Sequence, residues 1–250
     1  IFVRSGTTWT QQQKLTASDA AKEDYFGKSV SIDGDYAIVG ANGVDNETGA
    51  AYIFTRSGTT WTQQQKLTAS DAAEYDEFGA SYGGPGVSID GDYAIVGANG
   101  VNDYTGAAYI FKRDGASWTE QQKLTASDSE ADMYFGETVS ISGNLAIVGS
   151  DGSDGSYKGA AYIYRLSGGS WTEEGILTAS DAEEDDFFSE TGLYLNGAYA
   201  IAGTAYKNND TGSAYVYFLG DLILPRVELS TGDLSLGAVS SGGSSADSVK

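Results

Sequence analysis

The chain lacks cysteine and histidine, and it has only two prolines and one methionine among 250 residues. Without cysteine there is no disulfide, no thiolate zinc site and no thiol nucleophile. Without histidine there is no imidazole ligand and no histidine-based catalytic dyad or triad. Positive charge is also scarce, because 14 Lys+Arg face 35 Asp+Glu and leave a formal charge of −21.

This charge argues against nucleic-acid partners, which need a basic face, and anionic lipid surfaces would repel the chain. No stretch approaches the roughly 20 apolar residues of a membrane span, so no membrane insertion is predicted. What the chain does have is 34 glycines, 17 tyrosines, four tryptophans and 40 % hydrophobic residues, enough for a core. This composition predicts an acidic, all-β protein of one sizeable domain or two small ones.

Internal repeats dominate the sequence. The segment AAYIF at residues 50–54 returns at 107–111, as AAYIY at 160–164 and in degraded form as SAYVY at 213–217. Phe-Gly pairs at 26–27, 78–79 and 135–136 keep the same phase, with Phe-Ser at 188–189 as the fourth copy. The tryptophans at positions 9, 61, 118 and 171 follow the same period of just over 50 residues. An insertion near residues 82–86 accounts for the longest spacing.

Each repeat indicates four short strands. In the first complete copy, residues 30–32 precede an Asp-Gly hairpin signal, and the nearly continuous apolar run at 36–41 is typical of a strand buried on both faces. The apolar strand at 51–54 follows, and residues 61–67 form a polar strand suited to an exposed edge. Four strands with apolar inner members describe one blade of a β-propeller. A β-solenoid is the main alternative.

The Phe-Gly pair, the Val-Gly-Ala end of the second strand and the Gly-x-Ala-Tyr-Ile-Phe strand together resemble the FG-GAP repeat, the blade unit of integrin α-subunit propellers. The similarity is closest to the bacterial and archaeal branch with the linker WTxxxKLTASD, seen here at 9–19, 61–71, 118–128 and, altered, 171–181. Membership implies a ring, commonly of seven blades, on secreted or surface-anchored proteins. Integrin-type blades carry a calcium loop between the first two strands, whereas this chain has only short turns such as Asp33-Gly34 there. Calcium at that family position is therefore in doubt, because a tight hairpin cannot supply six to eight oxygen ligands.

The predicted propeller covers residues 1–220, with a partial repeat at 1–26 and further repeats near 27–78, 79–135, 136–188 and 189–219. About four and a half repeats do not make a seven-blade ring. The chain is therefore either a fragment of a longer protein, which the mid-strand start favours, or a smaller ring closed by strands from both ends.

Acidic residues cluster before each Phe-Gly position. Carboxylates without nearby histidine could hold a hard cation such as Ca²⁺. The alternative, which we favour, is that the Asp of each Ser-Asp pair caps a turn while the others form a solvated rim. The weak calcium candidates are Asp19, Asp24, Asp71, Asp76, Asp128, Asp132, Asp181 and Asp186.

Three other features suggest sites. Asn46 and Asn209 open N-glycosylation triplets in equivalent predicted loops. The tryptophans could stack on sugars, but packing against the neighbouring blade is favoured because they share one side of the fourth strand with Leu and Gln. Paired carboxylates could serve glycoside hydrolysis, but none breaks the repeat symmetry as a catalytic centre would, so no enzyme is predicted.

After residue 220 the pattern changes to short alternating strands. Residues 221–250 are interpreted as a linker with either the opening of an immunoglobulin-like module or a donor strand that adds to a neighbouring subunit's sheet. The assembly candidates there are Val227, Leu229, Leu234 and Leu236.

These features favour a non-catalytic, extracellular or cell-surface propeller that serves adhesion or binds a protein or glycan ligand. The alternative is a self-assembling extracellular structural protein, a filament or surface-layer subunit, whose copies join through sheet edges and the C-terminal strands.

Overall fold

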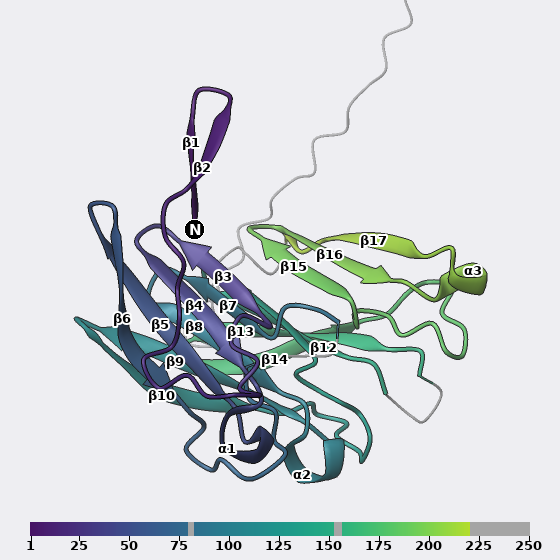
Figure 1. Ribbon diagram of the computed structural model, residues 1–250. Helices are drawn as coiled ribbons and strands as arrows, with labels where there is room; N and C mark the ends of the chain where they lie inside the picture. Colours follow the sequence, from purple (N-terminus) through teal and green to yellow (C-terminus); the bar gives the residue numbers. More distant parts are fainter. Residues whose placement is uncertain (80–82, 153–156, 221–250) are drawn as a thin grey trace, which may run out of the picture.

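The computed structural model describes residues 1–79, 83–152 and 157–220, and it shows an all-β chain whose four antiparallel sheets are arranged as a β-propeller (Figure 1). Blade 1 consists of β3 (Val30–Asp33), β4 (Tyr36–Ala41), β5 (Ala50–Ser57) and β6 (Thr60–Leu67). Blade 2 consists of β7 (Val87–Asp90), β8 (Tyr93–Ala98), β9 (Ala107–Asp114) and β10 (Ser117–Leu124). Blade 3 consists of β11 (Thr138–Ser142), β12 (Leu145–Ser150), β13 (Ala160–Ser167) and β14 (Ser170–Leu177).

Among the described residues, blade 4 consists of β15 (Gly192–Asn196), β16 (Tyr199–Thr204) and β17 (Ser213–Phe218), and β1 (Phe2–Ser5) pairs with β2 (Thr8–Gln11) in a separate hairpin. Short helical turns, α1 (Val44–Glu47), α2 (Val101–Tyr104) and α3 (Lys207–Asp210), join the second and third strands of blades 1, 2 and 4. Three complete blades followed by three strands of a fourth confirm the strand count that the repeats predict.

The core lies between the blades, and each blade therefore has two apolar faces. We call the face toward the preceding blade the leading face and the one toward the following blade the trailing face. Ile38 and Ile53 on the trailing face of blade 1 join Val87 on the leading face of blade 2 in one buried cluster. Equivalent clusters fill the next two interfaces. Because strands β4, β8 and β12 carry apolar residues on both faces, they read as continuous apolar runs in the sequence.

Paired glycines set the distance between blades. A Cβ atom on Gly40 would lie 1.5 Å from the carbonyl oxygen of Gly79, and one on Gly97 would lie 1.9 Å from that of Gly136. The Val-Gly end of one blade's second strand therefore touches the Phe-Gly pair of the next blade. Glycine at these positions therefore lets neighbouring blades approach closely.

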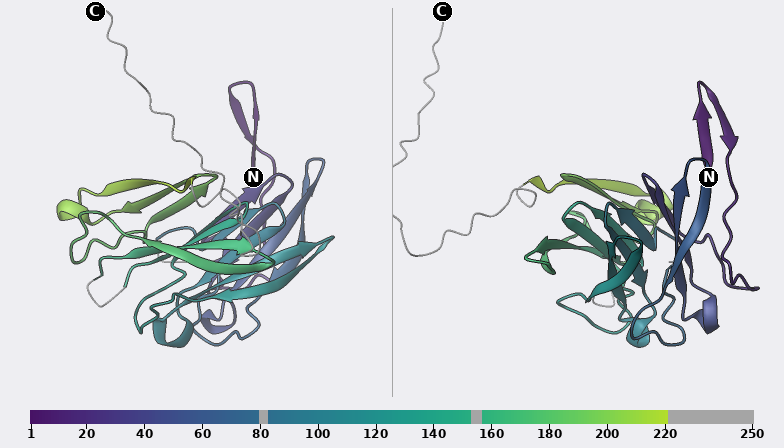
Figure 2. Two further views of the ribbon diagram at one scale, coloured as in Figure 1. Left: turned by 180° about the vertical axis from the view of Figure 1, so that it is seen from behind. Right: turned by 90° about the vertical axis from the view of Figure 1, so that its left-hand side faces the viewer.

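The four blades form an open arc (Figure 2). The first strands lie side by side in the order β3, β7, β11, β15. Val30 in β3 is 65 % exposed, whereas the equivalent Val87 in β7 is fully buried. At the other end of the arc, Ile201 and Val216 are 42 % and 67 % exposed. Among the described residues, parts of the leading face of blade 1 and of the trailing face of blade 4 are thus exposed.

Residues 12–17, after the N-terminal hairpin, run along the leading face of blade 1. Leu15 and Ala17 join the apolar cluster there, as Leu67 and Ala69 do at the next interface. This segment therefore behaves as the fourth strand of a blade that precedes blade 1. The proposed assembly residues Val227, Leu229, Leu234 and Leu236 lie outside the described residues.

Candidate functional site

The aspartates of the Ser-Asp pairs bind side chains of the blade that follows them. Asp19 Oδ2 lies 2.8 Å from Lys66 Nζ, and Asp71 Oδ2 lies 2.6 Å from Lys123 Nζ. Tyr109 also donates its hydroxyl to Asp71 Oδ1 at 2.8 Å. Both carboxylates thus tie the loop that enters a blade to that blade's fourth strand, and Asp71 also binds Tyr109 of the third strand.

The ionisation of these groups follows from their contacts. Partial burial raises the pKa of Asp71, but the hydrogen bonds from Lys123 and Tyr109 outweigh it, so the net pKa is lowered. Burial, and after it the hydrogen bond to Asp19, raises the pKa of Tyr52 to about 12. The carboxylates therefore stay ionised and the tyrosines stay neutral at physiological pH.

The remaining two Ser-Asp pairs differ. Asp128 lies near Tyr162, whose pKa is raised by burial and then by Asp128. Ile176 takes the place that Lys66 and Lys123 have in the other blades. Asp181 accepts a hydrogen bond from Tyr215 at 2.7 Å, and Lys207 is 3.8 Å away.

A second set of aspartates closes turns just before the Phe-Gly positions. Asp24, Asp76 and Asp186 are buried, and each accepts the backbone N–H of the residue three positions earlier, at 2.6, 2.8 and 2.7 Å. The turn caps are therefore these three residues and not, as we expected, the Asp of each Ser-Asp pair, and burial takes the three out of the predicted solvated rim. In the third copy, Met133 occupies the buried position, and the candidate Asp132 lies exposed beside it.

No group of three or more Asp or Glu side chains that could hold a metal ion occurs within residues 1–79, 83–152 and 157–220. Calcium binding at the eight aspartates therefore stays a prediction.

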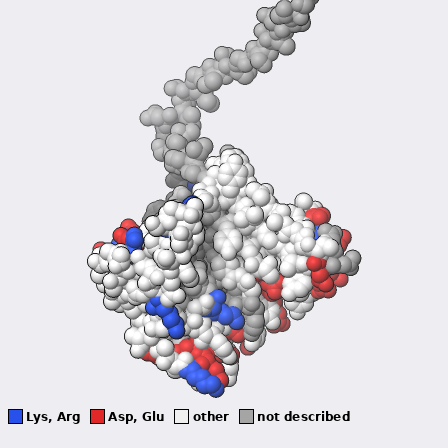
Figure 3. Space-filling model, turned by 45° about the horizontal axis from the view of Figure 1, so that its top comes forward, with Lys and Arg blue, Asp and Glu red and all other residues white. Residues whose placement is uncertain are grey.

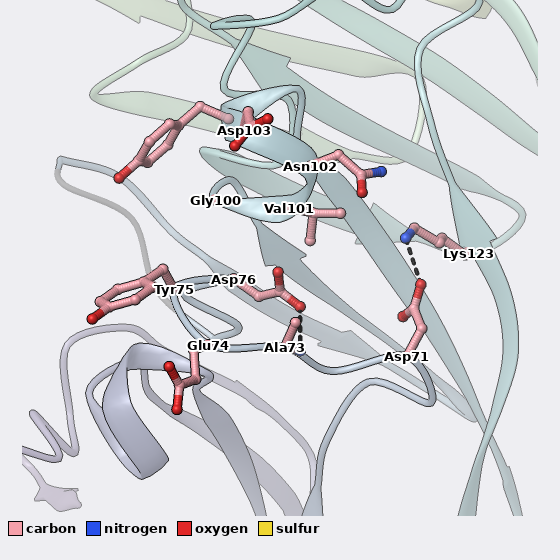
Figure 4. A pocket seen from close by; sticks show the side chains of 11 residues that line it. Asp71, Ala73, Glu74, Tyr75, Asp76, Gly100, Val101, Asn102, Asp103 and Lys123 are labelled. Atoms are coloured by element: carbon pink, nitrogen blue, oxygen red, sulfur yellow. Dashed lines mark hydrogen bonds and ion pairs between the residues drawn. The ribbon is translucent and has the colours of Figure 1, made fainter.

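The loops nevertheless form three related depressions on one side of the arc. Each lies between the loop that enters a blade and the loop between that blade's second and third strands. Their volumes are about 560, 480 and 500 Å³ in blades 2, 1 and 4. In blade 2 the loop with Asp71, Glu74 and Tyr75 faces the turn from Gly100 to Asp103 (Figure 4).

Exposed tyrosines accompany the carboxylates in these depressions. Tyr25 and Tyr75 are 56 % and 57 % exposed and line the depression of blade 1, and Tyr75 also lines that of blade 2. Tyr104 lies 5.2 Å from the ring of Tyr134 in blade 3. Aromatic faces, carboxylates and amides therefore alternate around this side of the arc, which we call the loop face.

Backbone hydrogen bonds fix the loop face across blade boundaries. Glu77 N–H donates to the carbonyl of Glu47 at 2.7 Å, and Tyr134 N–H donates to that of Tyr104 at 2.7 Å. The turns that accept these bonds have left-handed backbones, with φ of 57° at Asn46 and 53° at Asp103. Asn and Asp tolerate this conformation better than most residues, which explains their recurrence there.

Charge is unevenly distributed over the surface. On the face of the molecule shown in Figure 3, acidic side chains gather at the edges, a few basic side chains lie between them, and much of the remaining surface carries no charged side chain. Charge is therefore not a uniform coat on this face.

The glycosylation candidates fall in equivalent loops. Asn46 is exposed in α1 and donates its side-chain amide to Glu74 at 3.2 Å. Asn209 lies in α3, and its side chain is outside the described part of the structure. Modification at either position stays a prediction.

The tryptophans pack between blades as favoured, with one exception. Trp61, Trp118 and Trp171 are buried, whereas Trp9 in the N-terminal hairpin is 64 % exposed. Trp118 meets the ring of Tyr36 in the preceding blade at 6.1 Å.

Sequence reasoning missed the partners of the Ser-Asp carboxylates and the exposed tyrosines. The signal for Lys66 and Lys123 was present, because both lie five residues after a tryptophan, and their partners Asp19 and Asp71 lie ten residues after the preceding tryptophan. Each lysine lies in the fourth strand of a blade, whereas its aspartate lies in the loop before the first strand of the same blade. The two could be paired only by knowing that the fourth strand runs beside this loop.

A family model for the FG-GAP repeat matches residues 9–54, 61–111, 118–164 and 171–217, more than half of the chain. The chain therefore belongs to the FG-GAP repeat family, and its propeller is of the integrin-like kind. FG-GAP repeats are typically extracellular and generally non-catalytic. No curated protein matches the chain. Within its described residues, no helix is both long enough and apolar enough to cross a membrane.

Proposed function

We propose that this chain is a non-catalytic binding module of a secreted or cell-surface protein, and that its ligand docks on the loop face. The observation that carries the proposal is the repetition of one depression, with similar volume and similar tyrosine and carboxylate lining, in blades 1, 2 and 4. A repeated, shallow and polar site suits a ligand that is itself extended. A single reaction centre would need one of the copies to differ from the others.

The chemistry of the lining suits two ligand classes that the sequence already suggested. Tyrosine rings stack on sugar faces while carboxylates and amides accept hydroxyl groups, which favours a glycan. The same rings and carboxylates also bind the Lys and Arg side chains of a basic protein segment. The excess of acidic residues would speed the encounter with such a basic protein.

The test is a binding screen of the intact chain against a glycan array and against immobilised basic peptides. Tyr75→Ala and Tyr104→Ala are expected to weaken binding to any hit, because both rings line the depressions. The matched control is Tyr199→Ala, since Tyr199 is as exposed as Tyr75 but lies at the end of the arc, in β16. Binding that is unaffected by the two loop-face variants, or lost equally in the control, would contradict the proposal.

A further inference from the structure

The depression of blade 2 offers a ligand mainly hydrogen-bond acceptors. Its charged lining consists of one ammonium group, that of Lys123, and the carboxylates of Asp71, Glu74, Asp76 and Asp103. Asp71 and Lys123 bind each other at one side of the depression, and Tyr75 lies at the other side (Figure 4). An ionised carboxylate accepts hydrogen bonds and donates none. This lining therefore suits a ligand group that only donates.

Two of these carboxylates are available to a ligand. Glu74 and Asp103 are exposed, lie on the two opposed loops, and belong to no ion pair among the described residues. Glu74 accepts one hydrogen bond from the side-chain amide of Asn46, at 3.2 Å. Asp76, by contrast, is buried and closes its own turn. Two negative charges without a paired cation thus line a cavity of about 560 Å³.

We propose that the ligand of the loop face is an extended, lysine-rich polypeptide segment, and that one of its lysine side chains enters the depression of blade 2. The ammonium group binds Glu74 and Asp103, and the methylene stem lies on the rings of Tyr75 and Tyr104. This inference rests on the proposed binding function of the loop face, and it selects one of the two ligand classes considered there.

The chain binds its own ammonium groups in the same way on this side of the arc. The Nζ atom of Lys66, paired with Asp19, lies 5.6 Å from the ring centroid of Tyr52. The Nζ atom of Lys123, paired with Asp71, lies 5.3 Å from the ring centroid of Tyr109. A carboxylate and an aromatic face together therefore hold each ammonium group.

Blade 4 places an ammonium group beside the same loop from a different element. Lys207 begins α3, at the repeat position of Val101, and its side chain is only 2 % exposed. Its Nζ atom lies 2.8 Å from Asp186 Oδ2 and 3.9 Å from Glu183 Oε2. Asp186 is the repeat equivalent of Asp76. The fold thus binds a primary ammonium group beside this loop in three blades, from two different elements.

The positions of the chain's own arginines favour lysine over arginine as the group that enters the depression. Arg56 pairs with Asp35, and Arg113 pairs with Asp92. Both arginines lie toward the ends of β5 and β9 that are opposite to the loop face. On the loop side, lysines bind the carboxylates in blades 1, 2 and 4.

The boundaries beside the depression provide partners for both parts of a lysine side chain. At the boundary between blades 2 and 3, Tyr104 packs on Tyr134, with ring centroids 5.2 Å apart. At the boundary between blades 1 and 2, the repeat position of Tyr104 carries Glu47, which is exposed. Tyr75 lines the depressions of both blades, so the two adjoin. A segment that follows the arc therefore passes carboxylates and rings in turn, which matches ammonium groups and methylene stems.

A glycan fits these contacts less well than a lysine-rich segment. Glycan hydroxyl groups both donate and accept hydrogen bonds, but the strongest donor of the lining, Lys123, is already paired with Asp71. Glu74 and Asp103 would repel an anionic glycan. The net charge of −21 also attracts a basic segment from a distance.

The test measures the binding of short peptides to the intact 250-residue chain by fluorescence anisotropy. In the first peptide lysine alternates with serine, in the second every lysine is acetylated, and in the third arginine replaces lysine. We expect acetylation to weaken binding about tenfold or more, because it removes the charge. Equal affinity for the first two peptides would overturn the proposal, and tighter binding of the arginine peptide would show that lysine is the wrong residue.

Two substitutions locate the site. Glu74→Gln and Asp103→Asn each remove one charge from the lining at nearly constant size, and we expect each to weaken binding of the lysine peptide about fivefold. Asp114→Asn is the matched control, since Asp114 is exposed at the opposite end of β9. Equal losses in all three variants would mean that the peptide responds only to net charge, which contradicts the proposal. Far-ultraviolet circular dichroism checks that each variant is folded.

Two further ligands separate this inference from the proposed function. If a neutral glycan bound, Tyr75→Ala weakened its binding and the lysine peptide did not bind, the loop face would remain a binding surface and the assignment to lysine would be wrong. Spermine carries the same ammonium chemistry without a polypeptide. If spermine bound more tightly than the lysine peptide and depended on Glu74 and Asp103, a free polyamine would replace the polypeptide as the ligand.

Discussion

The side-chain amide of Gln65 closes two hydrogen bonds on the backbone of Trp118 in the next blade. Its Nε2 donates to the Trp118 carbonyl at 2.7 Å, and its Oε1 accepts the Trp118 N–H at 2.8 Å. Gln122 binds the backbone of Trp171 in the same way, with the same two distances. In the described residues, the fourth strands of neighbouring blades do not pair with each other as strands of one sheet. A glutamine side chain supplies the hydrogen bonds between them instead.

Replacing Gln65 by Ala should destabilise the propeller, because it leaves a backbone N–H and a carbonyl of Trp118 without partners. We expect a loss of about 1–2 kcal/mol in the free energy of unfolding, measured by urea denaturation. Thr62→Ala, on the exposed side of the same strand, is the control and should change stability little. Equal losses in the two variants would show that the paired hydrogen bonds contribute nothing.

The glycine contact between blades predicts a second stability effect. Gly97→Ala would place a methyl group 1.9 Å from the carbonyl oxygen of Gly136, so the two blades would have to separate. We expect a loss of about 3 kcal/mol or more, seen as a large fall in melting temperature. Gly175→Ala is the matched control, because no atom lies within 4 Å of the added methyl group. A melting temperature for Gly97→Ala close to that of the control would contradict the close approach.

Local pattern was enough to predict the blades. The apolar run at 36–41 and the Asp-Gly turn before it specify a buried strand and a hairpin, and β4 spans Tyr36–Ala41. Such features depend on neighbours along the chain. The Gln65 contact depends instead on how neighbouring blades are positioned relative to each other. The Lys123–Asp71 pair depends on the fourth strand lying beside the loop that enters its blade. No local sequence pattern encodes either arrangement.

The register of the acidic clusters shows the same limit. Counting carboxylates placed Asp132 with Asp24 and Asp76, although alignment on the Phe-Gly pair puts Met133 at their position. Burial decides the role here: the buried member closes the turn, and its exposed neighbour on the loop face does not. The exposure of Val30 and Val216, which contrasts with the burial of Val87, likewise required the structure.

Calcium binding is testable through the melting temperature. Oxygens of Asp24, Asp76 and Asp186 accept backbone N–H groups, and those of Asp19 and Asp71 face lysines. Because these contacts compete with a cation, we expect a chelator to leave the melting temperature unchanged. A rise on adding CaCl₂ that MgCl₂ does not reproduce, and that Asp76→Asn removes, would instead establish a calcium site in the loops.

Asp151 predicts that the stability of the fold depends on pH, and comparison with the other repeats shows why. It stands at the repeat position of Asn99, whose side-chain amide donates to Glu137, and Glu190 is the repeat equivalent of Glu137. In blade 3 a carboxyl group therefore replaces the donor. Buried oxygens of Asp151 and Glu190 have no hydrogen-bond partner among the described residues. Burial, and after it the charge of Glu190, raises the pKa of Asp151 to about 7.

Because the pKa of Asp151 is higher in the folded chain than in the unfolded one, its contribution to stability is complete below about pH 4. It is lost as the pH rises through 7. Asp151→Asn restores a donor that needs no proton. It should therefore raise the free energy of unfolding by about 2 kcal/mol at pH 8 and change it little at pH 4. Urea titrations at the two pH values measure this, with the exposed Asp103→Asn as the control for the loss of one charge. If Asp151→Asn destabilised the chain at pH 8, or changed its stability equally at both pH values, the raised pKa of Asp151 beside Glu190 would be contradicted.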